Sequence, residues 1–192
     1  SVGVQLMVRA DSGGSGVMFS IDTETGFPRT VLINAAWGLG ENVVQGAVDP
    51  DEYQVFKPFV GNADLIPILE KRRGEKAIKM ILQASGTPRN VPTSKAERES
   101  YVLSDTEIID LARQACIIEA HYGQPMDMEW ARDGDSGTLY IVQARPETVQ
   151  SRLDATADGG ISHAQPRRTR SARVFSMIAL QRGRVQAGLN GF

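Results

Sequence analysis

The chain has 192 residues, of which 41% are hydrophobic and 23% charged, as in an ordinary globular protein with one or two domains. Its net charge of −2 argues against general binding to nucleic acid or membrane surfaces, and no apolar run approaches the roughly 18 to 20 residues of a membrane span. The single Cys116 excludes a disulfide framework and a cysteine metal cluster, and without a recognisable signal peptide it favours the cytoplasm.

The first part of the chain is predicted to be mostly β-structure. Alternating hydrophobic residues predict strands at 2–8 and 17–21, with turns at 11–16 and 22–26. Residues 30–37 are largely apolar, which predicts a well-buried strand. Because the chain begins inside the first strand and lacks an initiator methionine, we expect it to be a fragment.

The middle of the chain continues this pattern. Gly38-Leu39-Gly40-Glu41 ends the buried strand, and a short helical or irregular segment follows to Gly46. Residues 86–100, with two prolines and no aliphatic run, are predicted to be a surface loop. Three further strands are expected at 53–57, 66–71 and 77–82, the last two joined as a hairpin through Arg73-Gly74-Glu75.

The clearest helix follows this loop. Ser104 and Glu107 have the spacing of a capping box, and hydrophobic residues recur at helical spacing from Ile108 to Tyr122. Gly123 and Pro125 end the helix. Its role is therefore to cover one face of the sheet.

The composition changes after residue 152. Residues 153–192 contain six arginines, two aspartates and no lysine or glutamate, a net charge of +4 that leaves −6 for residues 1–152. We expect residues 153–192 to be a disordered extension or an aberrant end of the chain. No aromatic interleaving supports an RNA-binding arm.

Residues 126–146 are predicted to form a β-hairpin. Two alternating segments flank a turn rich in Asp and Gly at 133–137. If Glu129 lies opposite Gln143, then Asp127 lies opposite Arg145, and all four side chains share one face. Carboxylate and amide oxygens suit a hard cation, and a guanidinium suits phosphate. The alternative is a solvated face with a cross-strand salt bridge.

The sequence resembles the phosphoenolpyruvate synthase family over about residues 1–152. The resemblance rests on many motifs in the family's order: Met7 to Asp11, Ser15 to Ser20, Asp22 to Gly26, Trp37 to Glu41, Val43 to Gly46, Asp49 to Glu52, His121 to Gly123, Asp127 to Trp130 and Ile141 to Thr148. It implies an α+β, ATP-grasp-like fold, of which residues 1–152 would be the C-terminal portion of a nucleotide-binding domain. That portion would be a mostly antiparallel sheet with packed helices.

The resemblance also implies a reaction. This family converts pyruvate, ATP and water to phosphoenolpyruvate, AMP and phosphate through a phosphohistidine, in pyruvate metabolism and gluconeogenesis. The implied partners are ATP, a phosphohistidine domain and a pyruvate-binding domain. Two alternatives stay open: another acceptor, as in rifampicin phosphotransferase or glucan, water dikinase, or a truncated module without catalytic activity. Alone, the chain is expected to be inactive.

Carried over residue by residue, the resemblance assigns the ATP and Mg²⁺ site to Glu129, Gln143 and Arg145. Glu129 is expected to bind Mg²⁺ directly, Gln143 to supply a neutral oxygen, and Arg145 to contact phosphate. Asp127 either orients Arg145 or faces water. Glu41 is placed near the metal or the ribose, with a favourable acid at a helix N-terminus as its structural alternative. The glycine-rich turn at 12–16 either approaches phosphates or is purely structural.

Overall fold

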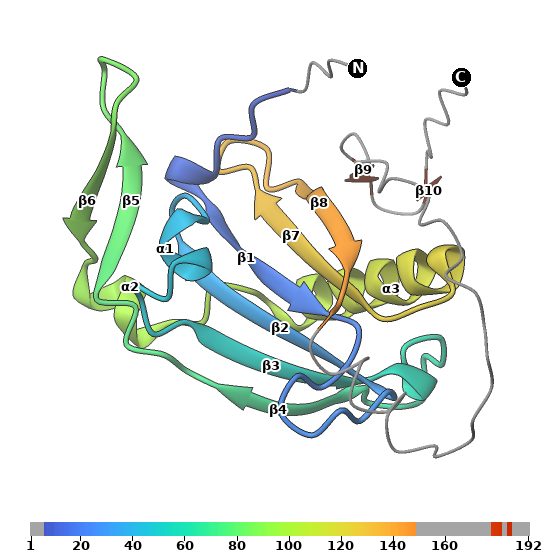
Figure 1. Ribbon diagram of the computed structural model, residues 1–192. Helices are drawn as coiled ribbons and strands as arrows, with labels where there is room; N and C mark the ends of the chain where they lie inside the picture. Colours follow the sequence, from blue (N-terminus) through green and yellow to red (C-terminus); the bar gives the residue numbers. More distant parts are fainter. Residues whose placement is uncertain (1–5, 149–177, 182–183, 186–192) are drawn as a thin grey trace, which may run out of the picture.

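The computed structural model describes residues 6–148, 178–181 and 184–185. They form an eight-stranded antiparallel sheet, in the order β10-β9-β8-β7-β1-β2-β3-β4, and a separate two-stranded sheet, β5-β6 (Figure 1). The strands of the large sheet are β1 (Gly14–Phe19), β2 (Thr30–Trp37), β3 (Asp51–Phe56), β4 (Ile68–Arg72), β7 (Met126–Arg132), β8 (Leu139–Pro146), β9 (Ile178–Gln181) and β10 (Arg184–Val185). The small sheet contains β5 (Ile78–Leu82) and β6 (Pro88–Pro92). The helices are α1 (Glu41–Val44), α2 (Lys95–Glu99), α3 (Asp105–Tyr122) and two short 3-10 helices, η1 (Ala10–Ser12) and η2 (Lys57–Phe59). The predicted α+β class with a mostly antiparallel sheet is confirmed.

Helix α3 covers one face of the large sheet (Figure 1). The Glu107 backbone N–H donates to Ser104 Oγ at 3.4 Å, and the Glu107 carboxylate accepts from the Ser104 backbone N–H at 2.8 Å. Gly123 ends the helix in the left-handed conformation, at a φ of 67°. The predicted boundaries and cap are confirmed.

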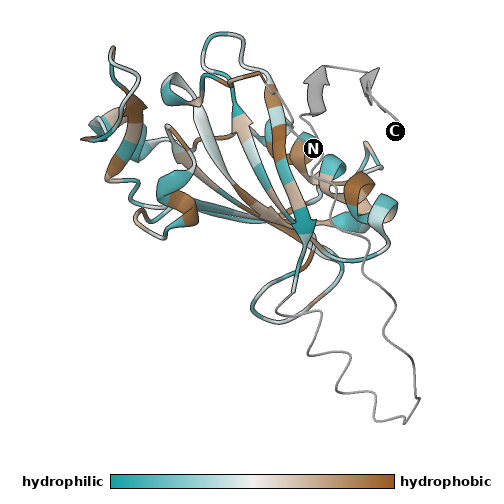
Figure 2. Cartoon of the chain, turned by 45° about the horizontal axis from the view of Figure 1, so that its top comes forward, coloured by the Kyte–Doolittle hydropathy of each residue, from teal (hydrophilic) through white to brown (hydrophobic). Residues whose placement is uncertain are grey.

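The core lies between α3 and the sheet. Residues of α3 that point to the sheet, including Ile108 and Leu111, are fully buried, as are Met18, Ile33 and Met128 on the strands. Burying a side chain of this size contributes about 1.5–3 kcal/mol. Hydrophobic and hydrophilic residues alternate along several strands (Figure 2), and on β7 the hydrophilic residues Asp127 and Glu129 face away from α3.

Two expectations near the N-terminus are wrong. Residues 6–8 of the predicted first strand form no strand, and residues 2–5 lie outside the described residues. Gly14 to Gly16, predicted as part of a turn, belong to β1, where Gly14 and Gly16 lie opposite Arg132 and Trp130. A Cβ on Gly16 would come within 1.8 Å of the Asn34 carbonyl oxygen, so close backbone packing requires glycine there. The approach of this turn to phosphates stays a prediction.

Two expectations in the middle of the chain are also wrong. Strands β4 and β5 do not form a hairpin, because β4 pairs with β3 and β5 pairs with β6. The predicted loop at 86–100 contains β6 and α2. Strand β6 tolerates prolines at both ends because it pairs only with β5 and lies at an edge.

A fully buried ion pair lies where the chain leaves the large sheet for β5. Lys76 Nζ donates to Asp51 Oδ1, and both side chains are 0% exposed. Asp51 also accepts from the backbone N–H groups of Gly74 (3.0 Å) and Val102 (2.8 Å) and from the Tyr53 hydroxyl (3.1 Å). This pair fixes the segment that carries the chain between the two sheets.

The arginine-rich segment 153–192 lies outside the described residues, apart from β9 and β10. These two strands extend the large sheet beyond β8. The domain boundary near residue 152 stays a prediction. Among the described residues, no helix is long and apolar enough to cross a membrane.

Candidate functional site

The β7–β8 hairpin has the predicted register at its open end. Glu129 lies opposite Gln143, and Asp127 lies opposite Arg145. Met126, Met128 and Trp130 are buried on the α3 side, whereas Asp127 and Glu129 are only partly buried on the other face. The hairpin thus brings together the four polar residues that the sequence placed on one face.

A β-bulge in β8 separates this polar end from an apolar end. The partner residue shifts from Gln143, opposite Glu129, to Ile141, opposite Trp130, so Val142 is left without a direct partner. In a regular strand Ile141 and Gln143, two positions apart, would share a face. Because of the bulge, Ile141 points into the core and Gln143 stays on the open face. The simple alternation that predicted the site does not extend past this point.

Arg145 and Asp127 form an ion pair beside Glu129. Arg145 Nε donates to Asp127 Oδ2 at 2.7 Å, and Arg145 Nη2 lies 2.7 Å from the same oxygen. The Asp127 side chain is 14% exposed and the Arg145 side chain 60% exposed. Asp127 was expected either to orient Arg145 or to face water, and the structure shows it in contact with Arg145. Much of the guanidinium remains accessible to a ligand.

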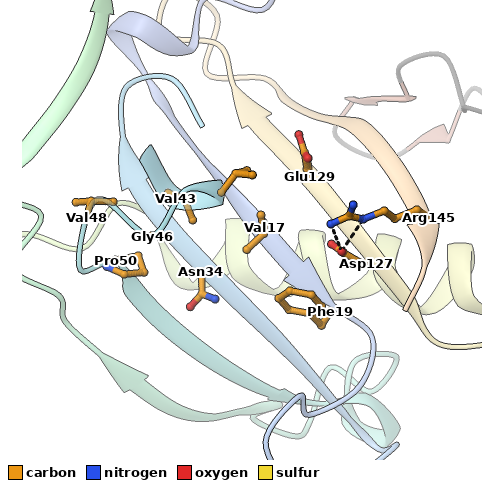
Figure 3. A pocket seen from close by; sticks show the side chains of 11 residues that line it. Val17, Phe19, Asn34, Val43, Gly46, Val48, Pro50, Asp127, Glu129 and Arg145 are labelled. Carbon is orange, nitrogen blue, oxygen red and sulfur yellow. Dashed lines mark hydrogen bonds and ion pairs between the residues drawn. The ribbon is translucent and has the colours of Figure 1, made fainter. Parts of the chain in front are cut away.

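Two adjoining hollows lie on this open face of the sheet. The first, about 290 Å³, lies between the sheet and the segment that contains α1 (Figure 3). The second, about 480 Å³, continues toward the N-terminal segment and is more apolar. Glu129 and Val44 line both. The first is also lined by Val17, Phe19, Asn34, Val43, Gly46, Val48, Pro50, Asp127 and Arg145.

Glu41 and Gln143 lie at the margins of these hollows. Glu41 lines the second hollow together with Glu129, so these two carboxylates share one space. It begins α1, as expected for an acid at a helix N-terminus, and its carboxylate also accepts a hydrogen bond from Gln45 Nε2 at 2.9 Å. Gln143 lies opposite Glu129 but lines neither hollow.

The side chains of Glu129 and Gln143 fit a hard divalent cation. Neither makes a hydrogen bond or ion pair with another described residue, so their oxygens are available to a ligand. Carboxylate and amide oxygens are donors that Mg²⁺ accepts. Among the described residues, no three His, Cys, Asp or Glu side chains form a metal cluster. A metal here would therefore need oxygens from its ligand, as Mg²⁺ bound to phosphates has.

Asn34 is a site residue that the sequence reasoning missed. It lies on β2, opposite Glu52 of β3, and lines the first hollow (Figure 3). Burial raises the pKa of Glu52, and the carboxylates of Glu24 and Glu70 raise it further. The available signal was a polar residue within the apolar run of residues 30–37. The apolar character of that run predicts only a buried strand.

Comparison with known proteins extends over most of the chain. The family model described as "Pyruvate phosphate dikinase, AMP/ATP-binding domain" matches residues 1–163. The phosphoenolpyruvate synthase of Synechocystis is 61% identical over 163 residues, which are 81% of this chain and 20% of that protein. Those of Pseudomonas aeruginosa and Escherichia coli are 56% and 52% identical, over 81% and 79% of this chain and 20% of each relative.

The chain therefore spans about a fifth of the length of these curated relatives. The family model matches well over half of it and includes the whole β7–β8 hairpin. The chain belongs to the family described as the AMP/ATP-binding domain of pyruvate phosphate dikinase.

Proposed function

We propose that this chain is part of the ATP site of a phosphoenolpyruvate synthase with an ATP-grasp fold. One observation carries the proposal: Glu129 and Gln143, opposite each other and without partners among the described residues, lie beside the Asp127–Arg145 pair. This arrangement offers oxygens to a cation and a guanidinium to phosphate on one face. The family and the names of the relatives favour a synthase over phosphotransferases with other acceptors.

In this proposal each residue has a distinct role. Glu129 and Gln143 hold Mg²⁺, which would neutralise phosphate charge when bound. Arg145 contacts phosphate oxygens, and Asp127 fixes the direction of its guanidinium. Glu41 lies across the second hollow from Glu129 and binds near the metal or the ribose. Phosphoryl transfer depends mainly on such positioning and charge neutralisation.

The whole protein would use this site in a larger reaction. ATP would phosphorylate a histidine on a separate domain, and pyruvate on a further domain would receive the phosphoryl group. The products would be phosphoenolpyruvate, AMP and phosphate, formed in the cytoplasm. These partner domains belong to the proposal, because the chain matches only a fifth of its relatives.

Calorimetric titration with Mg·ATP tests the proposed site. The chain should bind ATP only when Mg²⁺ is present, and Glu129→Gln should weaken binding by about 10- to 100-fold, the worth of an interaction with a charged group. Glu70→Gln is a matched control, because Glu70 is an exposed strand glutamate outside both hollows. It should leave binding unchanged.

A chimaera tests the proposed reaction. Residues 1–163 of this chain would replace the matching segment of the Synechocystis synthase, and phosphoenolpyruvate formation would be measured. Activity in the chimaera that is lost in its Glu129→Gln variant supports the proposal. If the chimaera forms no phosphoenolpyruvate, or if its Glu129→Gln variant forms it equally fast, the proposal is wrong.

A further inference from the structure

Three polar side chains without partners lie in one row across the open face of the sheet. Gln143 lies opposite Glu129, and Glu129 lies opposite Val17. The pairs Ser15–Ala36 and Met18–Ile33 place Asn34 beside Val17 on the next strand. The row therefore runs from β8 to β2 and ends with Asn34, opposite Glu52 of β3.

Asn34 is unusual for its position in the fold. It lies in the middle of an interior strand, and its neighbours on the same face, Leu32 and Ala36, are 7% and 2% exposed. Asparagine is disfavoured in strands. Its partly exposed amide makes no hydrogen bond to another described residue, so it is available to a ligand. The folding of β2 gives no reason for an amide here.

The first hollow supplies a reason. Asn34 lines this hollow, with Val17 and Phe19 beside it and the segment around α1 opposite, and Glu129 lines it too (Figure 3). Two strand spacings of about 4.8 Å separate the backbones of Asn34 and Glu129 by about 10 Å. One ligand of moderate length could therefore contact both residues.

The surroundings of Asn34 select an uncharged, hydroxyl-bearing group. The carboxylate of Glu52, which lies opposite Asn34, would repel a phosphate. Arg72 Nη2 lies 4.0 Å from Glu52 Oε2, so it neutralises this carboxylate only in part. An amide both donates and accepts hydrogen bonds, as a sugar diol does. In a nucleoside triphosphate the sugar is linked to the chain of phosphates. The distance from its hydroxyl groups to the outer phosphates is similar to the separation of the Asn34 and Glu129 backbones.

We propose that Asn34 hydrogen-bonds the sugar hydroxyls of a nucleotide whose metal-bound phosphates lie at Glu129. This inference rests on the proposed ATP site and adds a residue that distinguishes sugars at the opposite end of the first hollow. Asn34 is a binding residue that sets specificity and takes no part in the transfer of the phosphoryl group.

The test compares three probes in calorimetric titrations of the chain with Mg²⁺: ATP, 2′,3′-dideoxy-ATP and inorganic tripolyphosphate. Asn34→Ala should weaken ATP binding by about three- to tenfold, the worth of one or two neutral hydrogen bonds. It should remove the preference for ATP over the dideoxy compound and leave tripolyphosphate affinity unchanged. Gln54→Ala, which removes an amide from the neighbouring strand outside both hollows, is the control and should change nothing.

The outcomes separate the two proposals. If Glu129→Gln weakens binding of all three probes but Asn34→Ala leaves ATP affinity and sugar preference intact, the role of Asn34 is refuted and the ATP site stands. If Asn34→Ala weakens tripolyphosphate as much as ATP, Asn34 contacts phosphate and the sugar assignment is wrong. If no probe binds in a Mg²⁺-dependent way, both proposals fail.

Discussion

The buried Lys76–Asp51 pair gives a large and specific prediction for stability. In Lys76→Met, Asp51 would remain in the interior with three neutral donors, the Gly74 and Val102 N–H groups and the Tyr53 hydroxyl, and no counter-charge. Removing one partner of a buried pair costs about 3–5 kcal/mol, because the other charge is left uncompensated. Burial and the nearby Asp51 charge both raise the pKa of Tyr53, so its hydroxyl stays a neutral donor.

Urea denaturation of the chain, followed by circular dichroism, measures this loss. With a typical slope of about 2 kcal/mol per molar urea, the midpoint should fall by about 1.5–2.5 M. Lys79→Met is a matched control, because the Lys79–Glu97 pair is 26% and 23% exposed and should contribute about 1 kcal/mol or less. The double variant Lys76→Met/Asp51→Asn removes both charges and should recover part of the loss. A loss below about 1 kcal/mol for Lys76→Met would refute the reasoning.

Three further predictions concern the cap, a close contact and the phosphate contact. Burial raises the pKa of Glu107, but hydrogen bonds from the helix cap and a guanidinium outweigh it and hold the pKa below its ordinary 4.5. The ionised Glu107 carboxylate therefore stabilises the fold fully above pH 4.5, and this stabilisation is lost as the pH falls below that value. In Glu107→Gln, the free energy of unfolding should decrease less steeply as the pH is lowered. Gly16→Ala should destabilise by at least about 1–3 kcal/mol in urea, because its Cβ meets the Asn34 carbonyl, whereas Gly61→Ala, in open space, should not. Arg145→Lys should weaken Mg·ATP binding in calorimetry by about tenfold with little change in the urea midpoint, because a lysine cannot make two parallel contacts with phosphate; equal affinity would contradict its role.

The β7–β8 hairpin shows how far alternation predicts a structure. Alternating side chains and a turn rich in Asp and Gly correctly placed Glu129 opposite Gln143. The same rule would place Ile141 on the polar face with Gln143, which conflicts with the hydrophobicity of Ile141. The structure resolves this conflict with a bulge at Val142. The conflict was visible in the sequence and could have predicted the bulge.

Long-range pairing was not predictable in this way. Arg73-Gly74-Glu75 has the composition of a hairpin turn, yet the buried contact between Lys76 and Asp51 directs the chain to a second sheet. That contact joins residues 25 positions apart, and no local pattern indicates it. The position of the segment around α1 over Asn34 is also a contact between separate elements, so no local pattern in the sequence predicted it.

The central claim is that a cation bound to a nucleotide lies on the open face of the sheet, at Glu129 of β7 and Gln143 of β8. Manganese can replace magnesium, and its unpaired electrons broaden the NMR signals of nearby amides. In the presence of ATP, Mn²⁺ should broaden the amide signals of residues 127–130 and 142–145 strongly and those of α3 weakly, since α3 lies on the opposite face of the sheet (Figure 1). Uniform broadening, or broadening centred on another part of the chain, would contradict the account.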